Sequence, residues 1–223
     1  MDAGRRLQAL PSRQVLADGV YEQIRALIMN DGIEPGARVN IDEIARELGV
    51  SGTPVREALA RLESEELVSR LPLRGYRVTE LLNRKEVDDM YALRLLLEPP
   101  SAARAASAMS DANVAALEAE LATCPAAPAE DAHSDYKALT AHDARLHELI
   151  LHLAGNVAVE QAFARTHCHL HFFRLNYNQP FGEQTIAEHR VIVDALVAGN
   201  AVGARKAMTD HLEVARDRLL SRL

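Results

Sequence analysis

Two short helical patterns meet at a very tight hinge in residues 41–68, IDEIARELGVSGTPVREALARLESEELV, and this stretch constrains the fold more than any other. Apolar residues repeat at i, i+3, i+4 and i+7 on both sides of the hinge, first at Ile41, Ile44, Ala45 and Leu48 and then at Val55, Ala58, Leu59 and Leu62. That spacing is typical of one buried helix face. Because only residues 49–52 lie between the two patterns, we expect two helices joined by a tight turn.

The residues around the hinge indicate how the two helices end and begin. Gly49 can adopt the left-handed conformation that ends a helix. Thr53 can cap the second helix, with Pro54 at its first position. The pattern leaves Thr53, Arg56 and Ala60 on the face opposite the apolar residues. A helix-turn-helix of this kind presents the start of its second helix to a DNA major groove, although an ordinary helical hairpin would show the same local pattern.

The next segment favours the DNA-binding interpretation. LVSRLPLRGYRV, residues 67–78, alternates like a two-stranded ribbon that turns around Pro72 and Gly75. A ribbon at this place is typical of the wing of a winged helix. Arg70, Arg74 and Arg77 cluster there, and arginines in a wing suit contacts with phosphates or with the minor groove.

Residues 15–78 resemble the GntR family of bacterial transcriptional regulators, most specifically in LGVSGTPVREALARLESEELV. The resemblance implies a protein that binds double-stranded operator DNA. Because a single winged helix reads only a few base pairs, we expect it to bind a palindromic operator as a homodimer. The family usually has an arginine between the serine and the threonine of this motif, where this chain has Gly52, so Arg56 becomes the expected base or phosphate contact. The predicted DNA-contacting residues are Thr53, Arg56, Arg70, Arg74, Gly75 and Arg77.

Charge shows what kind of DNA contact is possible. The formal net charge is −7, and residues 1–80 contain 11 arginines against 13 acidic residues. A generally basic DNA-binding domain is therefore excluded. Any DNA contact must come from locally placed arginines.

Composition indicates a helical protein. Aromatic residues make up 4% of the chain and Trp is absent, which favours helices packed through Leu, Ala and Val. We expect a mostly α protein with three domains: a flexible N-terminal arm (1–14), a winged helix-turn-helix of three helices and a small β wing (15–80), and an all-α bundle (81–223). The sequence shows no membrane-spanning apolar run and no secretory signal. Cys124 and Cys168 form no C-x-x-C pair, so we expect reduced thiols in a cytoplasmic protein.

The bundle is predicted from capping and stop signals. Asn83 and Glu86 fit a capping box that starts its first helix, and Pro99-Pro100 could kink or split that helix. A second helix is expected after Ser110. Further helices fit residues 134–153, 157–176, 183–198 and 201–221.

All nine histidines lie between His133 and His211, so the second half of the chain carries chemistry that the first half lacks. Asp143 and His147 share a helix face at i, i+4. With His189 and His211 they could form a site for zinc, nickel or a similar divalent metal that leaves room for a ligand. From spacing alone, other histidines compete for this role: His142, His152, His167, His169 and His171. In the run H-C-H-L-H (167–171), helical geometry separates His167 from His169, and we favour a role outside the metal site for that run.

LTAHDARLHELILHLAGN and EHRVIVDALVAGNAVGARKAMTDHL look like the all-helical FCD effector domain of FadR-type GntR regulators. Many members of that family bind a divalent metal through an Asp and a His four residues apart and two later histidines. The resemblance assigns these positions to Asp143, His147, His189 and His211. It also implies that Arg94 points into the effector cavity and meets a carboxylate, whereas the residues alone favour a buried pair with Glu98 equally well.

The sequence thus predicts a regulator, rather than an enzyme, whose operator binding is controlled by a small organic acid bound at the metal site. His142-Asp143 keeps a metal-dependent HD-type phosphohydrolase open as an alternative, and a metal-binding helical protein is another. Neither alternative gives a role to the helix-turn-helix and the arginine-bearing wing.

Overall fold

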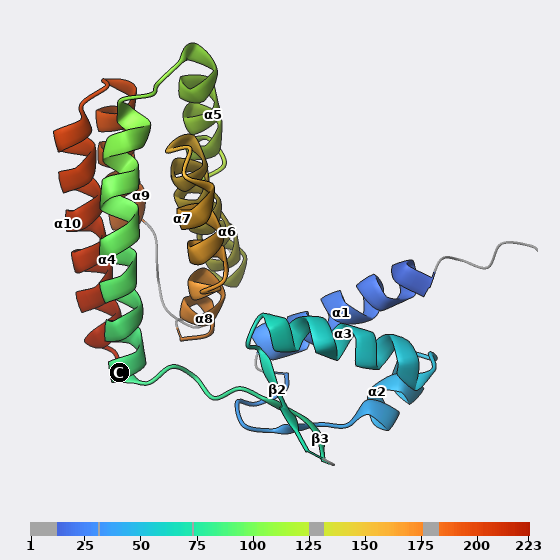
Figure 1. The fold of residues 1–223 in the computed structure, drawn as a ribbon. Helices are drawn as coiled ribbons and strands as arrows, with labels where there is room; N and C mark the ends of the chain where they lie inside the picture. The colour runs from blue at the N-terminus through green and yellow to red at the C-terminus, as the bar shows by residue number, and fades with distance from the viewer. Residues whose placement is uncertain (1–12, 31, 73, 125–131, 176–182) are drawn as a thin grey trace, which may run out of the picture. The chain divides into compact units, whose positions relative to one another are not determined.

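A computed structural model describes residues 13–30, 32–72, 74–124, 132–175 and 183–223. The chain divides into two compact units, Met1–Leu81 and Leu82–Leu223. The predicted fold class is confirmed, because the protein is mostly helical and a small sheet occurs in the N-terminal unit (Figure 1). The arm predicted for residues 1–14 lies outside the described residues, except for its last two residues, which belong to the first helix.

Three helices form the body of the N-terminal unit: α1 (Arg13–Met29), α2 (Ile41–Glu47) and α3 (Gly52–Ser64). α1 and α2 both pack against α3. The apolar face predicted for α3 is confirmed, since Val55, Ala58, Leu59 and Leu62 are all fully buried. Gly49 ends α2 with a φ of 65°, as its position in the hinge predicted.

The predicted cap of α3 is wrong. The helix begins at Gly52, its N-cap is Ser51, and no side chain forms a cap hydrogen bond. Thr53 and Pro54 are therefore the second and third helical residues. The first four N–H groups of a helix have no partner within the helix, so a proline fits the third position as well as the first. The presence of Pro54 is therefore compatible with a helix that starts two residues earlier, and it does not identify the first helical residue.

The wing is a sheet of three antiparallel strands in the order β1-β3-β2, formed by β1 (Arg38–Val39), β2 (Val68–Leu71) and β3 (Gly75–Val78). The sequence predicted β2 and β3 and missed β1, whose two residues are too few to show any alternation. Arg77 pairs with Arg38 on one side and with Ser69 on the other. Because paired residues share a face of the sheet, β1 brings another arginine beside Arg77.

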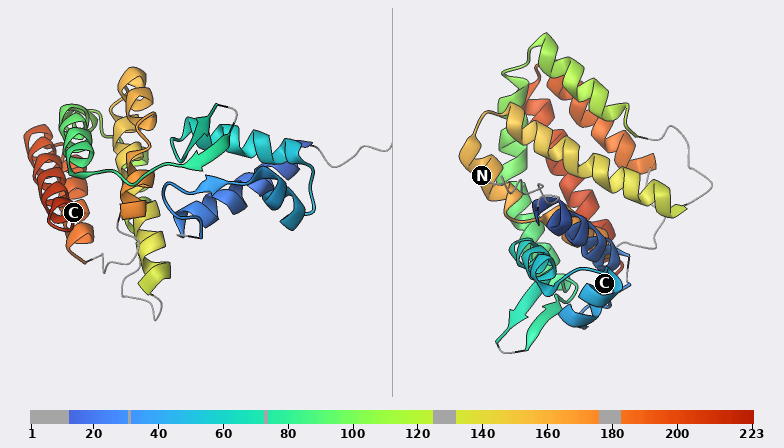
Figure 2. Two further views of the ribbon diagram at one scale, coloured as in Figure 1. Left: turned by 90° about the horizontal axis from the view of Figure 1, so that it is seen from below. Right: turned by 90° about the vertical axis from the view of Figure 1, so that its right-hand side faces the viewer.

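The C-terminal unit is a bundle of seven helices within its described residues: α4 (Arg84–Ala106), α5 (Asp111–Leu121), α6 (Ala132–Leu153), α7 (Val157–Ala164), α8 (Cys168–Leu175), α9 (Glu183–Val197) and α10 (Ala201–Leu220). α4 runs alongside α10, and both contact α9. α7 and α8 pack against α6, and α6 packs against α4 (Figures 1 and 2). The predicted capping box of Asn83 and Glu86 is confirmed at the start of α4.

Two helix predictions need correction. Pro99-Pro100 do not split α4, which continues to Ala106. The prolines remove two backbone donors, but α4 packs closely against α10, and this packing supports the continuous helix. The single helix predicted for 157–176 is two helices, because His167 adopts a left-handed φ of 45° between α7 and α8.

Candidate functional site

The start of α3 carries the predicted DNA-contacting residues on its exposed side. Thr53 and Arg56 are both exposed, opposite the buried apolar face. The guanidinium of Arg56 folds back over Gly52, since a Cβ added at Gly52 would lie 2.8 Å from Arg56 Nη1. The absence of a side chain at residue 52 therefore gives Arg56 its place at the N-terminus of the helix.

The wing collects further arginines. Arg70 and Arg74 are exposed, and Arg77 is half-buried between its neighbouring strands. Gly75 has a φ of 81°, a conformation that favours glycine and lets the chain turn into β3. Arg38, which the sequence analysis missed, is exposed beside Arg77. The strand that carries Arg38 is too short to show in the sequence pattern.

Four side chains converge within the C-terminal unit. Asp143 and His147 come from α6, His189 from α9 and His211 from α10. One ligand atom from each of them lies within 4.8 Å of the other three. Nε2 of His147 lies 3.2 Å from Nε2 of His211, and Nε2 of His189 lies 3.2 Å from Oδ1 of Asp143. Neighbouring ligands of a cation with bonds of about 2.1 Å lie about 3–4 Å apart, so the cluster could hold a divalent metal.

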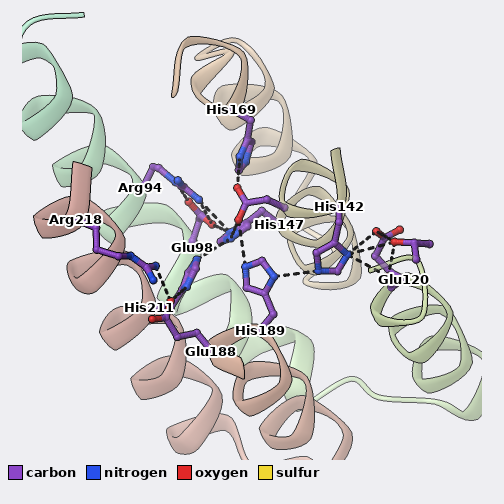
Figure 3. A network of polar contacts seen from close by, with 12 residues as sticks. Arg94, Glu98, Glu120, His142, His147, His169, Glu188, His189, His211 and Arg218 are labelled. Carbon is purple, nitrogen blue, oxygen red and sulfur yellow. Dashed lines mark hydrogen bonds and ion pairs between the residues drawn. The ribbon is translucent and has the colours of Figure 1, made fainter. Parts of the chain in front are cut away.

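Each of the three histidines is held by a second partner on its outer nitrogen, Nδ1 (Figure 3). Nδ1 of His147 donates to Glu98, and Nδ1 of His211 donates to Glu188 over 2.8 Å. Such partners place the proton on Nδ1 and leave the Nε2 lone pair for a metal. Without a cation, the facing Nε2 atoms of His147 and His211 would present two lone pairs to each other.

His189 is held by a longer relay. Its Nδ1 lies 3.0 Å from Nε2 of His142, and Nδ1 of His142 lies 3.0 Å from a carboxylate oxygen of Glu120 on α5. Nε2 of His189 is buried and has no hydrogen-bond partner within the part of the chain that the structure describes. His142, which the sequence offered as a competing ligand, therefore serves as an outer partner. The one sequence feature that could have indicated this role is that His142 directly precedes the candidate ligand Asp143.

Electrostatics also suit a metal. Burial lowers the pKa of His147 to about 3 and lowers the pKa of His211, so both imidazoles are unprotonated at neutral pH. Burial alone would raise the pKa of Asp143, but the hydrogen bond from His169 and the adjacent imidazole of His189 hold it well below its usual range. At neutral pH, Asp143 thus offers a carboxylate and His147 and His211 offer neutral imidazoles, which are ligands for zinc and similar metals.

His169, from the run that we had placed outside the metal site, lies directly against it. Its Nδ1 is 2.9 Å from Oδ2 of Asp143, so Asp143 turns Oδ1 toward the histidines. The break at His167 explains the difference, because α8 starts in a new direction there and the continuous-helix geometry no longer applies. The remaining competitor on α6, His152, has a 70% exposed side chain.

Arg94 forms the buried pair that the residues alone had suggested. Its Nε lies 2.5 Å from Glu98 Oε1, and its Nη2 lies 3.2 Å from His147 Nδ1. Burial would lower the pKa of Arg94, but Glu98 outweighs this effect and keeps the guanidinium charged. Arg94 thus neutralises the carboxylate that orients His147.

A cavity of about 50 Å³ adjoins the cluster. Asp143 and His211 form part of its wall, and Arg94 and His169 line it as well. Two further arginines, Arg218 and Arg222, line the cavity, and apolar and hydroxyl side chains complete its wall, among them Tyr91, Thr140, Phe172, Phe173, Thr185 and Leu219. A small molecule in this cavity would therefore touch both the candidate metal centre and an arginine.

Two family profiles match the chain. Residues 16–78 match the family described as bacterial regulatory proteins, gntR family, and residues 89–214 match the FCD domain. The FCD match covers more than half of the chain and includes all four candidate metal ligands. Every helix in the described parts of the chain is too short or too polar to cross a membrane.

Relatives and solved structures agree with these profiles. A Streptomyces ambofaciens HTH-type transcriptional regulator from an unstable DNA locus is 30% identical over 200 residues, covering 89% of this chain and 82% of that protein. The HTH-type regulator YdhC of Bacillus subtilis (strain 168) is 28% identical, covering 86% and 85%. The structure of Escherichia coli McbR/YncC has a TM-score of 0.66 at 22% identity and covers 92% of this chain and 97% of that chain, which supports the fold alone.

Proposed function

Because this chain belongs to the GntR family of bacterial transcriptional regulators and carries an FCD domain, we propose that it binds operator DNA as a homodimer under the control of a small organic acid. The relatives are transcriptional regulators, so the chain is a DNA-binding regulator and not a phosphohydrolase. The acid, the metal and the dimer are our proposal. Since the operator is part of a bacterial chromosome, the protein acts in the cytoplasm.

The DNA-contacting surface in this proposal consists of the start of α3 and the wing. Thr53 and Arg56 enter the major groove, while Arg70, Arg74 and Arg77 meet phosphates or the minor groove. Gly75 shapes the turn that presents these arginines. Homodimer formation would match a palindromic operator with two-fold protein symmetry. The exposed side chains of Leu93 and Leu96, one turn apart on α4, offer an apolar face for the second copy.

The observation that carries the effector proposal is the cavity, which touches both the metal cluster and Arg94. Zinc or nickel held by Asp143, His147, His189 and His211 would supply a Lewis-acidic cation that attracts a carboxylate. Arg94 would grip the same acid, because a guanidinium presents several donors in one plane. Arg94 already donates to Glu98, the carboxylate that orients His147, so effector binding would also disturb the residue that positions a metal ligand.

The proposed regulation depends on the fact that the metal ligands and Arg94 come from different helices. Three helices, α6, α9 and α10, supply the metal ligands, and a fourth, α4, supplies Arg94. Closing around an acid would change how these helices pack. α4 follows the wing after residues 79–83, so a shift of its first turn could change the spacing of the DNA-binding units in the dimer. A coupling of about 1–3 kcal/mol would change operator affinity by about 5- to 150-fold.

The proposal is tested by DNA binding under controlled metal and acid. Duplexes selected from a randomised pool would serve as operator, and affinity would be measured by fluorescence anisotropy for protein treated with chelator, loaded with Zn²⁺ or loaded with Ni²⁺. We expect tight DNA binding, and an effect of added small carboxylic acids only when metal is present. An acid effect that survives complete metal removal would contradict the metal-centred mechanism.

A further inference from the structure

His169 borders the cavity, and only one of its ring nitrogens has found a partner. The residue is 8% exposed, and its Nδ1 is used by Asp143. Its Nε2 is buried and has no hydrogen-bond partner among the described residues. A buried polar atom of this kind is costly and calls for a ligand or ordered water. Since the same residue lines the cavity, a ligand in that cavity can supply the partner.

We propose that Nε2 of His169 contacts the effector directly and selects a carboxylic acid that also carries a hydroxyl group. This inference rests on the proposed function, because it concerns the cavity in which that function places the acid. It adds a specificity-determining residue to the metal ligands and Arg94. It also favours hydroxy acids over acids that carry only an alkyl chain.

A hydroxyl is the group that fits this nitrogen in any protonation state. Neutral His169, with its proton on Nδ1 toward Asp143, offers a lone pair at Nε2, to which a hydroxyl donates. Protonated His169 offers an N–H at Nε2, from which the oxygen of the same hydroxyl accepts. A second carboxylate fits only the protonated form, and an alkyl group fits neither. The preference for a hydroxyl over an alkyl group therefore does not depend on how His169 titrates.

The neighbours of His169 limit where the hydroxyl can be. The ring centroid of His169 lies 5.3 Å from that of the metal ligand His147 and 5.6 Å from that of Phe163. The effector carboxylate belongs beside the metal and Arg94, so the hydroxyl must lie close to it. We therefore expect the hydroxyl on the second or third carbon of the acid.

Two substitutions separate the two nitrogens of His169. In His169→Asn, the side-chain amide takes the place of Nδ1 and can still donate to Asp143, but the Nε2 position is lost. In His169→Gln, the amide takes the place of Nε2, and the bond to Asp143 is lost. The Asn variant thus keeps the hydrogen bond to the metal ligand Asp143 and loses the proposed effector contact. The Gln variant keeps the effector contact and loses the hydrogen bond to Asp143.

The experiment measures acid binding by calorimetry to the full-length, Zn²⁺-loaded protein. The probes are propanoate, 2-hydroxypropanoate and 3-hydroxypropanoate. We expect the unsubstituted protein to prefer a hydroxy acid over propanoate by about 5- to 150-fold, the range expected for leaving a buried polar group unpaired. His169→Asn should retain Zn²⁺ affinity and lose that preference. His169→Gln should bind Zn²⁺ more weakly and, once loaded, keep most of the preference.

The possible outcomes separate a failure of the inference about His169 from a failure of the proposed organic-acid effector. If the unsubstituted protein binds all three acids equally, or if His169→Asn keeps the full preference, the role of His169 is refuted while the organic-acid effector stands. If none of the acids binds to the Zn²⁺-loaded protein, the organic-acid effector is refuted, and the inference about His169 with it.

Discussion

The two units of this protein arrange their functional side chains in opposite ways. In the N-terminal unit, Thr53, Arg56 and Arg74 are exposed. In the C-terminal unit, His147, His189 and His211 are at most 3% exposed, and a second residue fixes each of them. The first arrangement suits a large, hydrated and charged partner. The second suits a cation that must find its ligands already in place.

This difference predicts how each unit responds to mutation. Exposed arginines act on DNA largely through phosphate charge, so each contributes a part of the affinity and salt weakens them all. A buried cluster depends on every member, because losing one ligand leaves the others desolvated and misdirected. Effects should therefore be largest in the metal cluster and smallest in the wing.

The largest effect is expected for His189→Ala, which removes a metal ligand. Loss of an outer partner costs about 10- to 100-fold in metal affinity, so we expect loss of a ligand to cost more than about 100-fold. Stabilisation by Zn²⁺ or Ni²⁺ in thermal unfolding should disappear, together with the response to an acid. Binding to operator DNA should persist, since the DNA-contacting residues belong to the other unit.

His152→Ala is the matched control for this experiment. It also removes a histidine, but from a side chain that is 70% exposed and pairs only with Glu160 among the contacts described. Its metal affinity should equal that of the unsubstituted protein. A His189→Ala protein that still binds metal and responds fully to acid would remove His189 from the site.

The next effect is expected for Arg56→Ala. If Arg56 contacts a base with two hydrogen bonds, its loss should weaken operator binding by about 1–3 kcal/mol and relax specificity at one base pair. Anisotropy titrations with the selected operator and with single-base variants would measure both effects. Arg104→Ala removes the same charge from an exposed position on α4, and it should leave operator affinity almost unchanged. Equal affinities for the Arg56→Ala and Arg104→Ala variants would exclude a base contact.

The sequence could predict contacts between residues that lie close together in the chain, but not contacts between residues that lie far apart in it. The i, i+4 spacing of Asp143 and His147 and the apolar face of α3 are local patterns, and the structure agrees with them. Glu120 and Glu188 lie on helices whose relative positions no local pattern defines. His169 was expected outside the set of metal ligands, but no local pattern predicted its hydrogen bond to the ligand Asp143, because a single left-handed residue, His167, changes the direction of the chain before α8.

The wing shows the same limit in the N-terminal unit. β2 and β3 share a hairpin, and their alternation predicted them. β1 lies about 30 residues earlier in the chain and has only two residues, so only its pairing with β3 reveals it. Thr53 was assigned as a helix cap because a threonine before a proline resembles a helix start, yet Ser51 occupies that position.

A further test concerns the relay behind His189. His142→Phe removes the acceptor for His189 Nδ1, so metal affinity should fall by about 10- to 100-fold, as expected for an outer partner. His142→Gln places an amide oxygen where Nε2 was, and this oxygen can accept the same proton. The Gln variant should therefore recover much of the affinity in a competition titration with a coloured chelator. If the Phe variant bound metal normally, His142 would be a packing residue and not a positioning one.

The smallest effect is expected for Arg74→Ala in the wing. Arg74 is exposed at the turn before Gly75, where a phosphate contact adds affinity without base specificity. Losing one such contact should make the slope of log K against log salt shallower by about 0.9. Operator and nonspecific duplexes should weaken by similar factors, in contrast to Arg56→Ala, which should weaken the operator selectively. Titrations of both duplexes at several salt concentrations would measure these slopes. An unchanged slope would show that Arg74 does not neutralise a phosphate, and it would shift the charge contact of the wing toward Arg38 and Arg77, which lie side by side on the sheet.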